Sequence, residues 1–217
     1  MLCAARLFRA TLALGLFLAN TAPCLAVTNP ATVPALAYAS LMRSINPHLQ
    51  VGESRAYASA LLTNSRKMHV DPLLVMALVT VESGWNVRAE SIDGAEGLGQ
   101  IKPGTARVLG IDPWSPRSNI RGITMYLHRL LGLFGEARQP IREALAGYNA
   151  GPIAVKRYGG VPPIPETRRY VAKVLSALHA FRLRLPAAMH FNVRTAVAVA
   201  DTAALIDRSQ AAYWGAR

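Results

Sequence analysis

The stretch DPLLVMALVTVESGWNVRAESIDGAEGLGQIKPGTA, residues 71–106, decides the fold of this chain. It opens with Asp-Pro, an N-capping residue followed by one that suits the first position of a helix. Residues 73–81 are apolar almost all round, which predicts a helix buried on most sides. Gly84 supplies the stop signal. The last turn of this helix therefore carries Glu82, at the negative end of the helix dipole.

Glu82 is the candidate catalytic group of the chain. An apolar setting and the carboxyl end of a helix both favour the protonated form of a carboxylic acid. A carboxylic acid that stays neutral near pH 7 suits the general acid of glycoside cleavage, because the departing sugar oxygen must receive a proton. The glycines of residues 94–99 let the backbone approach a ligand closely, and Gln100 offers both a donor and an acceptor. A single glutamate at a helix end is more often structural, so the assignment depends on the remaining motifs.

The rest of the chain favours helices over strands, because no alternating pattern of useful length occurs. A small hairpin within residues 91–100 is the one β element that we expect. The apolar spacing predicts a short helix at 35–45 and longer helices at 52–69, 119–134 and 165–185. Pro and Gly signals predict a helix that begins at Pro103, a helix that ends at Gly151 and Pro152, and a Gly- and Pro-rich loop at 158–165.

Four sequence blocks follow one another in the order of a known family. They are the block from Glu82-Ser83 to Thr105-Ala106, the pairs Asn119-Ile120 and Tyr126-Leu127, ALAGYNAGP at 144–152, and ETRRYV at 166–171. Together they resemble the catalytic domain of soluble-type lytic transglycosylases over approximately residues 51–185. The resemblance implies a mainly α-helical, goose-type lysozyme-like fold with at most a minimal β-hairpin.

The resemblance also implies a reaction and a set of site residues. Glu82 would act first as acid and then as base, cleaving the β-1,4 bond between N-acetylmuramic acid and N-acetylglucosamine of peptidoglycan without water, to give a 1,6-anhydromuramoyl product. No cofactor or metal is implied. The expected substrate-binding residues are Ser83, Ser91, Gln100, Tyr148, Asn149 and Tyr170. Gly99 departs from the family, which often has Met there, so a side chain that would pack the cleft floor is missing.

Two other kinds of function stay open at this point. A lysozyme-like hydrolase would recruit water through a second carboxylate, for which Asp93 and Glu96 are the candidates beside Glu90. A non-catalytic wall-binding accessory of a secretion or conjugation system would need no acid, and the intact Glu82 argues against it.

The two ends of the chain lie outside the resemblance. Residues 1–26 read as an export signal, 27–50 as an N-terminal extension and 186–217 as a C-terminal extension. Both cysteines, Cys3 and Cys24, fall in the signal, so the mature chain would have no disulfide. A proline directly before Cys24 argues against lipid attachment. We therefore expect a periplasmic protein whose membrane contact is limited to the export signal.

The charge of the chain points to an anionic partner. The net charge is +12, and it becomes +10 when the two arginines of the export signal leave. The basic residues are scattered and aromatic residues are few, which argues against nucleic acid. Peptidoglycan carries acidic stem peptides, so its glycan strands fit the charge. The five histidines show no short metal-ligand spacing.

Overall fold

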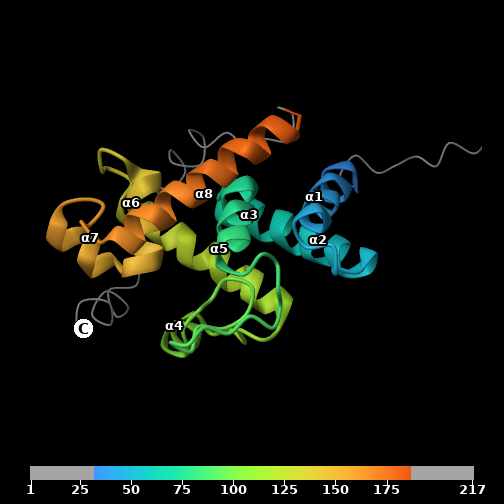
Figure 1. Cartoon of the computed structure of the whole chain (residues 1–217), viewed down its shortest axis with the longest axis horizontal. Coiled ribbons are helices and arrows are strands. Elements are labelled where there is room, and N and C mark those ends of the chain that lie inside the picture. Colours follow the sequence, from blue (N-terminus) through green and yellow to red (C-terminus); the bar gives the residue numbers. More distant parts are fainter. Residues whose placement is uncertain (1–31, 187–217) are drawn as a thin grey trace, which may run out of the picture.

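The structure is a computed structural model that describes residues 32–186, and in this range the fold is mainly α-helical, as predicted (Figure 1). The only β features among these residues are two isolated antiparallel bridges, Glu90 with Glu96 and Glu96 with Ile101. The export signal, both cysteines and the C-terminal extension lie outside the described residues. The helices are α1 (Thr32–Ile45), α2 (Val51–Met68), α3 (Pro72–Glu82), α4 (Pro103–Leu109), α5 (Pro116–Leu133), α6 (Pro140–Ala150), α7 (Pro152–Tyr158) and α8 (Pro165–Arg184).

Proline marks the start of six of these helices. Each helix from α3 to α8 has Pro as its first residue. This position suits proline because its missing N–H would have no partner inside the helix and its φ is already helical. Helix α7 was not predicted. Pro152, interpreted as part of the end of α6, also begins α7, and Gly151 with φ +84 makes the turn between the two helices.

Helix α3 lies at the centre of the molecule (Figure 1). All residues from Pro72 to Val79 are buried, which agrees with the uniformly apolar sequence of this stretch. The helix packs most extensively against α8 and also contacts α2 and α5. Trp85, just after the helix, is fully buried, and its indole N–H donates to the hydroxyl of Thr80 at 3.2 Å. The core therefore encloses the helix that carries Glu82 at its end.

Helix α1 belongs to the same core. It packs against α2, and its Tyr38 and Met42 are fully buried. Asn46, just after α1, donates its side-chain amide to the carbonyl of Trp85 at 3.2 Å, which ties this region to the end of α3. The domain boundary at residue 51 stays a prediction, but the helix before it contributes to the folding of the acid-bearing region.

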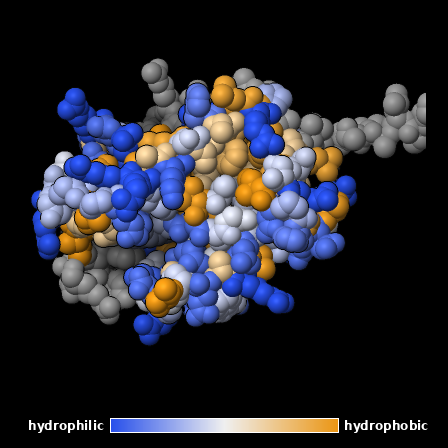
Figure 2. Space-filling model, viewed as in Figure 1, coloured by the Kyte–Doolittle hydropathy of each residue, from blue (hydrophilic) through white to orange (hydrophobic). Residues whose placement is uncertain are grey.

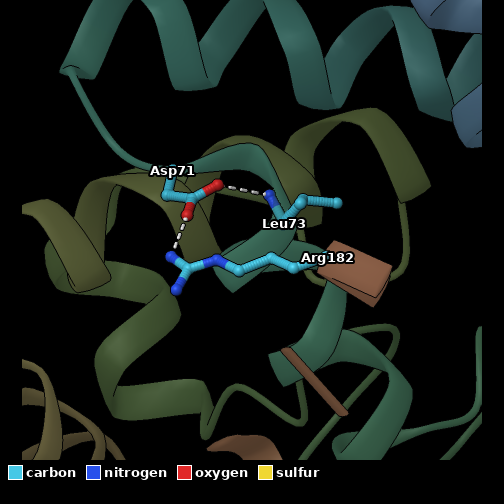
Figure 3. A network of polar contacts seen from close by, with 3 residues as sticks. All are labelled: Asp71, Leu73 and Arg182. Carbon is cyan, nitrogen blue, oxygen red and sulfur yellow. Dashed lines mark hydrogen bonds and ion pairs between the residues drawn. The ribbon is translucent and has the colours of Figure 1, made fainter. Parts of the chain in front are cut away.

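The start of α3 is held by a polar cluster (Figure 3). Asp71 accepts a hydrogen bond from the backbone N–H of Leu73 at 2.8 Å, the N-cap that the sequence predicts. Its second oxygen accepts from the Arg182 guanidinium of α8 at 2.9 Å. The Asp71 side chain is 2% exposed, so this ion pair neutralises a buried charge. Helix α8 is thereby fixed to the beginning of α3.

No helix within residues 32–186 is both long and apolar enough to cross a membrane.

Candidate active site

The candidate site lies at the carboxyl end of α3, where the helix enters the loop of residues 83–102 (Figure 1). Ser83 caps the helix end, and Gly84 turns the chain with φ +57, a conformation that suits glycine. Glu82 is the last helical residue and is only partly exposed. Glu82 thus sits at the edge of the core.

Tyr170 makes the closest contact with this carboxyl group. Its hydroxyl donates a hydrogen bond of 2.7 Å to Oε1 of Glu82. Tyr170 is buried and comes from α8, so the helix fixed to the start of α3 through Arg182 also contacts its end. Arg182 follows Tyr170 by twelve residues, which is about 18 Å along the axis of α8. Helix α8 therefore fixes both ends of α3.

The surroundings of Glu82 make it a weak acid. Burial raises the pKa of Glu82 from 4.5 to about 7, against the lowering effect of the hydrogen bond from Tyr170. Neither cause is the charge of another carboxylate. At neutral pH the group is divided between its acid and its carboxylate forms, so it can both donate and accept a proton.

Tyr148 of α6 forms the second side of the site. Burial first, and then the negative charge of Glu82, raise the pKa of Tyr148 well above its usual range. Its ring meets that of Tyr126 from α5, with centroids 5.1 Å apart and an interplanar angle of 44°. Its hydroxyl donates to the carbonyl of Gly99 at 2.9 Å. The three groups Glu82, Tyr148 and Tyr170 thus come together from three helices.

Besides Tyr148, three of the expected site residues bond to the backbone of the loop. The Ser83 hydroxyl donates to the carbonyl of Leu98 at 2.8 Å. The Ser91 hydroxyl accepts from the N–H of Ala95 at 2.9 Å. The Gln100 amide donates to the carbonyls of Ala89 and Gly97, at 3.0 and 3.1 Å. These side chains hold the shape of the loop, and no hydrogen bond joins any of them to Glu82.

Two further contacts hold the loop and the end of α6. Asn119 of α5 is fully buried; its side-chain oxygen accepts from the N–H of Gly99 at 3.0 Å, and its amide donates to the carbonyl of Glu96 at 3.2 Å. Asn149, which is exposed, accepts a hydrogen bond of 2.7 Å from the hydroxyl of Thr167. Asn149 therefore links α6 to α8, with its bonded oxygen turned to Thr167.

Gly99 has a neighbour that the sequence alone did not reveal. A Cβ at this position would overlap the side chain of Ile123 and lie 3.0 Å from the hydroxyl of Tyr148. Ile123, on α5, is fully buried. The space of a side chain at residue 99 is thus already filled by the core, a contact that the apolar periodicity of residues 119–134 does not indicate.

The other carboxylates of the loop have no contact with Glu82. Glu90 and Asp93 are exposed, while the backbone of Glu96 pairs with Glu90 and Ile101 in the two bridges. Within residues 32–186, no group of three or more His, Cys, Asp or Glu side chains could hold a metal ion. The site therefore offers one carboxyl group and two phenols.

The chain is similar to known proteins in sequence and in structure. Residues 59–170 match the family profile described as "Transglycosylase SLT domain". The soluble lytic murein transglycosylase of Salmonella typhimurium is 33% identical over 153 residues, which cover 59% of this chain and 23% of the relative. A transglycosylase of Enterobacteria phage PRD1 is 36% identical over 88 residues, covering 40% of this chain and 32% of the relative. The chain thus spans about a quarter to a third of the length of these relatives.

Solved structures show the same similarity. The 70-kDa soluble lytic transglycosylase of Escherichia coli superposes with a TM-score of 0.53 at 26% identity, covering 73% of this chain and 32% of that chain. A complex of the 70-kDa soluble lytic transglycosylase with bulgecin A gives a TM-score of 0.53 at 27% identity, over 64% of this chain and 27% of that chain.

Proposed function

Because this chain belongs to the Transglycosylase SLT domain family, we propose that it is a lytic transglycosylase of peptidoglycan in which Glu82 is the only catalytic carboxyl group. The observation that carries the proposal is the partly buried Glu82 at the end of α3, with a pKa of about 7 and a hydrogen bond from Tyr170. The Salmonella typhimurium relative supports the class of substrate, since it is a soluble lytic murein transglycosylase.

The reaction begins with Glu82 as general acid. Its carboxyl proton passes to the oxygen of the β-1,4 bond between N-acetylmuramic acid and N-acetylglucosamine, and the bond from that oxygen to the anomeric carbon breaks. The carbonyl oxygen of the muramoyl acetamido group attacks the same carbon and takes the place of a nucleophilic carboxylate. A site with one carboxyl group suits this substrate-assisted step.

The second step uses the same side chain as general base. The Glu82 carboxylate takes the proton of the muramoyl C6 hydroxyl, whose oxygen then attacks the anomeric carbon and displaces the acetamido oxygen. A 1,6-anhydro ring closes, no water is consumed, and Glu82 returns to its acid form. A pKa of about 7 suits both roles, because neither protonation state is strongly disfavoured at neutral pH.

The two phenols support this proposal in different ways. Tyr170 donates to the carboxylate form of Glu82 and so stabilises the state that must accept a proton in the second step. Tyr148, packed against Tyr126, offers an apolar ring beside the acid that can lie against a sugar. We assign Ser83, Ser91 and Gln100 the role of shaping the loop that borders the substrate, and Asn149 the role of bracing α6 against α8.

We further propose that the protein acts outside the cytoplasmic membrane, where its substrate lies. Residues 1–26 would provide the export signal, and the mature protein would act on murein in the periplasm.

The test is mass spectrometry of fragments released from purified peptidoglycan by the wild-type chain and by Glu82→Gln. We expect 1,6-anhydromuropeptides from the wild type and a loss of at least about a thousandfold in their rate of release from the variant. Asp93→Asn and Glu96→Gln are the matched controls and should retain activity. Reducing-end products from the wild type would instead mean hydrolysis. Release from neither chain would favour a wall-binding accessory, such as one that serves a secretion or conjugation apparatus.

A further inference from the structure

A cavity separate from the candidate active site lies between α6 and α8. It has a volume of about 430 Å³, and Glu82 is not among the residues that line it. Three arginines contribute to its wall: Arg138 just before α6, Arg142 in the first turns of α6, and Arg168 near the start of α8. The size is that of a pocket for a small ligand.

The guanidinium groups of this cavity have no partners within residues 32–186. No hydrogen bond or ion pair joins the side chain of Arg138, Arg142 or Arg168 to another residue of this range, although Arg182 in the same helix as Arg168 is paired with Asp71. All three are exposed, and the cavity contains one carboxylate, that of Glu143. Three guanidinium groups against one carboxylate leave an excess of positive charge directed at a concave surface.

The rest of the lining favours a peptide over a sugar. No aromatic residue lines the cavity, whereas sugar rings are commonly held against aromatic faces. Gly159 and Gly160 leave backbone uncovered on one side, and the apolar surface is limited to two valines, Val161 and Val171. The surface over α6, α7 and the start of α8 is correspondingly mostly hydrophilic in Figure 2.

The cavity is close to the candidate active site in sequence and along the helices, but none of Glu82, Tyr148 and Tyr170 lines it. Arg168 precedes Tyr170 by two residues, so the two side chains lie about 200° apart around α8. Arg142 precedes Tyr148 by six residues, about 9 Å along α6. The cavity and the candidate active site therefore draw on the same two helices, α6 and α8, but share no lining residue.

We propose that this cavity binds the carboxylates of a peptidoglycan stem peptide through Arg138, Arg142 and Arg168. This inference rests on the proposed function for its choice of ligand. Guanidinium groups bind carboxylates through paired, charge-assisted hydrogen bonds, and a stem peptide carries several carboxylates within a few residues. The Glu143 carboxylate then faces the free ammonium group of the diamino acid. The cavity anchors a stem peptide while a glycan strand occupies the active site.

Calorimetric titration of the full chain with a free stem tetrapeptide, L-Ala-γ-D-Glu-meso-diaminopimelate-D-Ala, tests this proposal. We expect binding by the wild type and a loss of about tenfold or more in the triple variant Arg138→Gln/Arg142→Gln/Arg168→Gln. The matched control is Arg43→Gln/Arg55→Gln/Arg66→Gln, which removes the same charge from exposed arginines of α1 and α2 and should change the affinity less than about twofold.

Other results would overturn the proposal. The first two are absence of binding by the wild type and equal binding by the two triple variants. The other two are binding of a fully amidated tetrapeptide as tight as that of the free tetrapeptide, and binding of inorganic phosphate as tight as that of the free tetrapeptide. The last result would make the cavity a phosphate site. Because the titration contains no glycan, it reports on the cavity even if the Glu82→Gln experiment disproves the proposed reaction.

Discussion

The hydrogen bond between Tyr170 and Glu82 makes the pH dependence of the reaction adjustable at a single residue. The first step of the proposed reaction needs protonated Glu82, so kcat/KM should fall about tenfold per pH unit above about 7. The Tyr170 hydroxyl lowers the pKa of Glu82. Tyr170→Phe should therefore raise that pKa and move the alkaline limb of the kcat/KM profile to higher pH. A pH series of anhydromuropeptide release measures this shift.

A suitable control is Tyr158→Phe, which removes a hydroxyl from an exposed tyrosine. Its profile should coincide with that of the wild type. A Tyr170→Phe profile with a lower rate but an unchanged alkaline limb would show that the hydroxyl positions the acid without tuning its pKa.

Gly99 and Ile123 form a pair that should respond to mutation together. Gly99→Met places a side chain where Ile123 already packs, and overpacking of this kind costs about 1–3 kcal/mol in the free energy of unfolding. Ile123→Ala alone costs about 2–5 kcal/mol by leaving a cavity. The double variant should cost less than the sum of the two, because each change relieves the other.

Urea denaturation of the four chains measures this coupling. Gly132→Met on the same helix as Ile123 serves as control, since a side chain there meets no atom within 4 Å and should be tolerated. Strict additivity of Gly99→Met and Ile123→Ala would contradict the packing described for this pair.

Residues differ in how far the sequence could predict them. The position of Glu82 at the end of α3 was predictable because a uniformly apolar helix that ends in one carboxyl group is a local pattern. The pairing of Gly99 with Ile123 was not, because 24 positions of chain separate two residues that only tertiary packing brings together. The same applies to the bonds of Ser91 and Gln100, whose partners are backbone atoms of a loop without periodicity.

At the scale of elements, the start of α3 depends on Asp71 for two separate interactions. Asp71→Ala removes both the N-cap and the ion pair with Arg182 and should lower the free energy of unfolding by about 2–3 kcal/mol. Asp71→Asn keeps an oxygen for the Leu73 N–H and loses only the ion pair, so its loss should be smaller. Urea denaturation distinguishes the two, and equal losses would mean that the cap contributes nothing.

Helix boundaries were the most predictable feature at this scale. Proline as first residue and glycine as stop are chemical signals within a few residues, and they placed α3, α4 and α8 closely. Helix α7 was missed because Pro152 is compatible with two interpretations, the end of one helix or the beginning of the next. Local sequence does not choose between them when only Gly151 separates the helices.

For the whole molecule, the excess of basic residues should govern retention on the wall polymer. The net charge of +12 attracts an acidic polymer over the screening length, which falls from ~10 Å at ~0.1 M salt to ~3 Å at ~1 M. The fraction of Glu82→Gln chain that sediments with insoluble peptidoglycan should therefore drop steeply over this range. Retention that is independent of salt would place the attraction in uncharged contacts.

The overall fold class followed from the sequence, whereas the contribution of α1 did not. The absence of alternating strand patterns and the four family blocks predicted a lysozyme-like helical domain. The short helix at the start of the described range was interpreted as an extension, because amphipathic spacing says that a face is buried but not against what. Only the structure shows Tyr38 and Met42 in the common core.

Because α8 contacts both ends of α3, the two helices have to be transferred together in protein engineering. Arg182 contacts the N-cap residue of α3 and Tyr170 contacts its last residue, so α8 is joined to α3 at both ends. Anyone who transplants the acid into another scaffold must move both helices as one cassette. A graft of α3 alone would carry the carboxyl group but neither the phenol that regulates its proton nor the guanidinium that seats the opposite end.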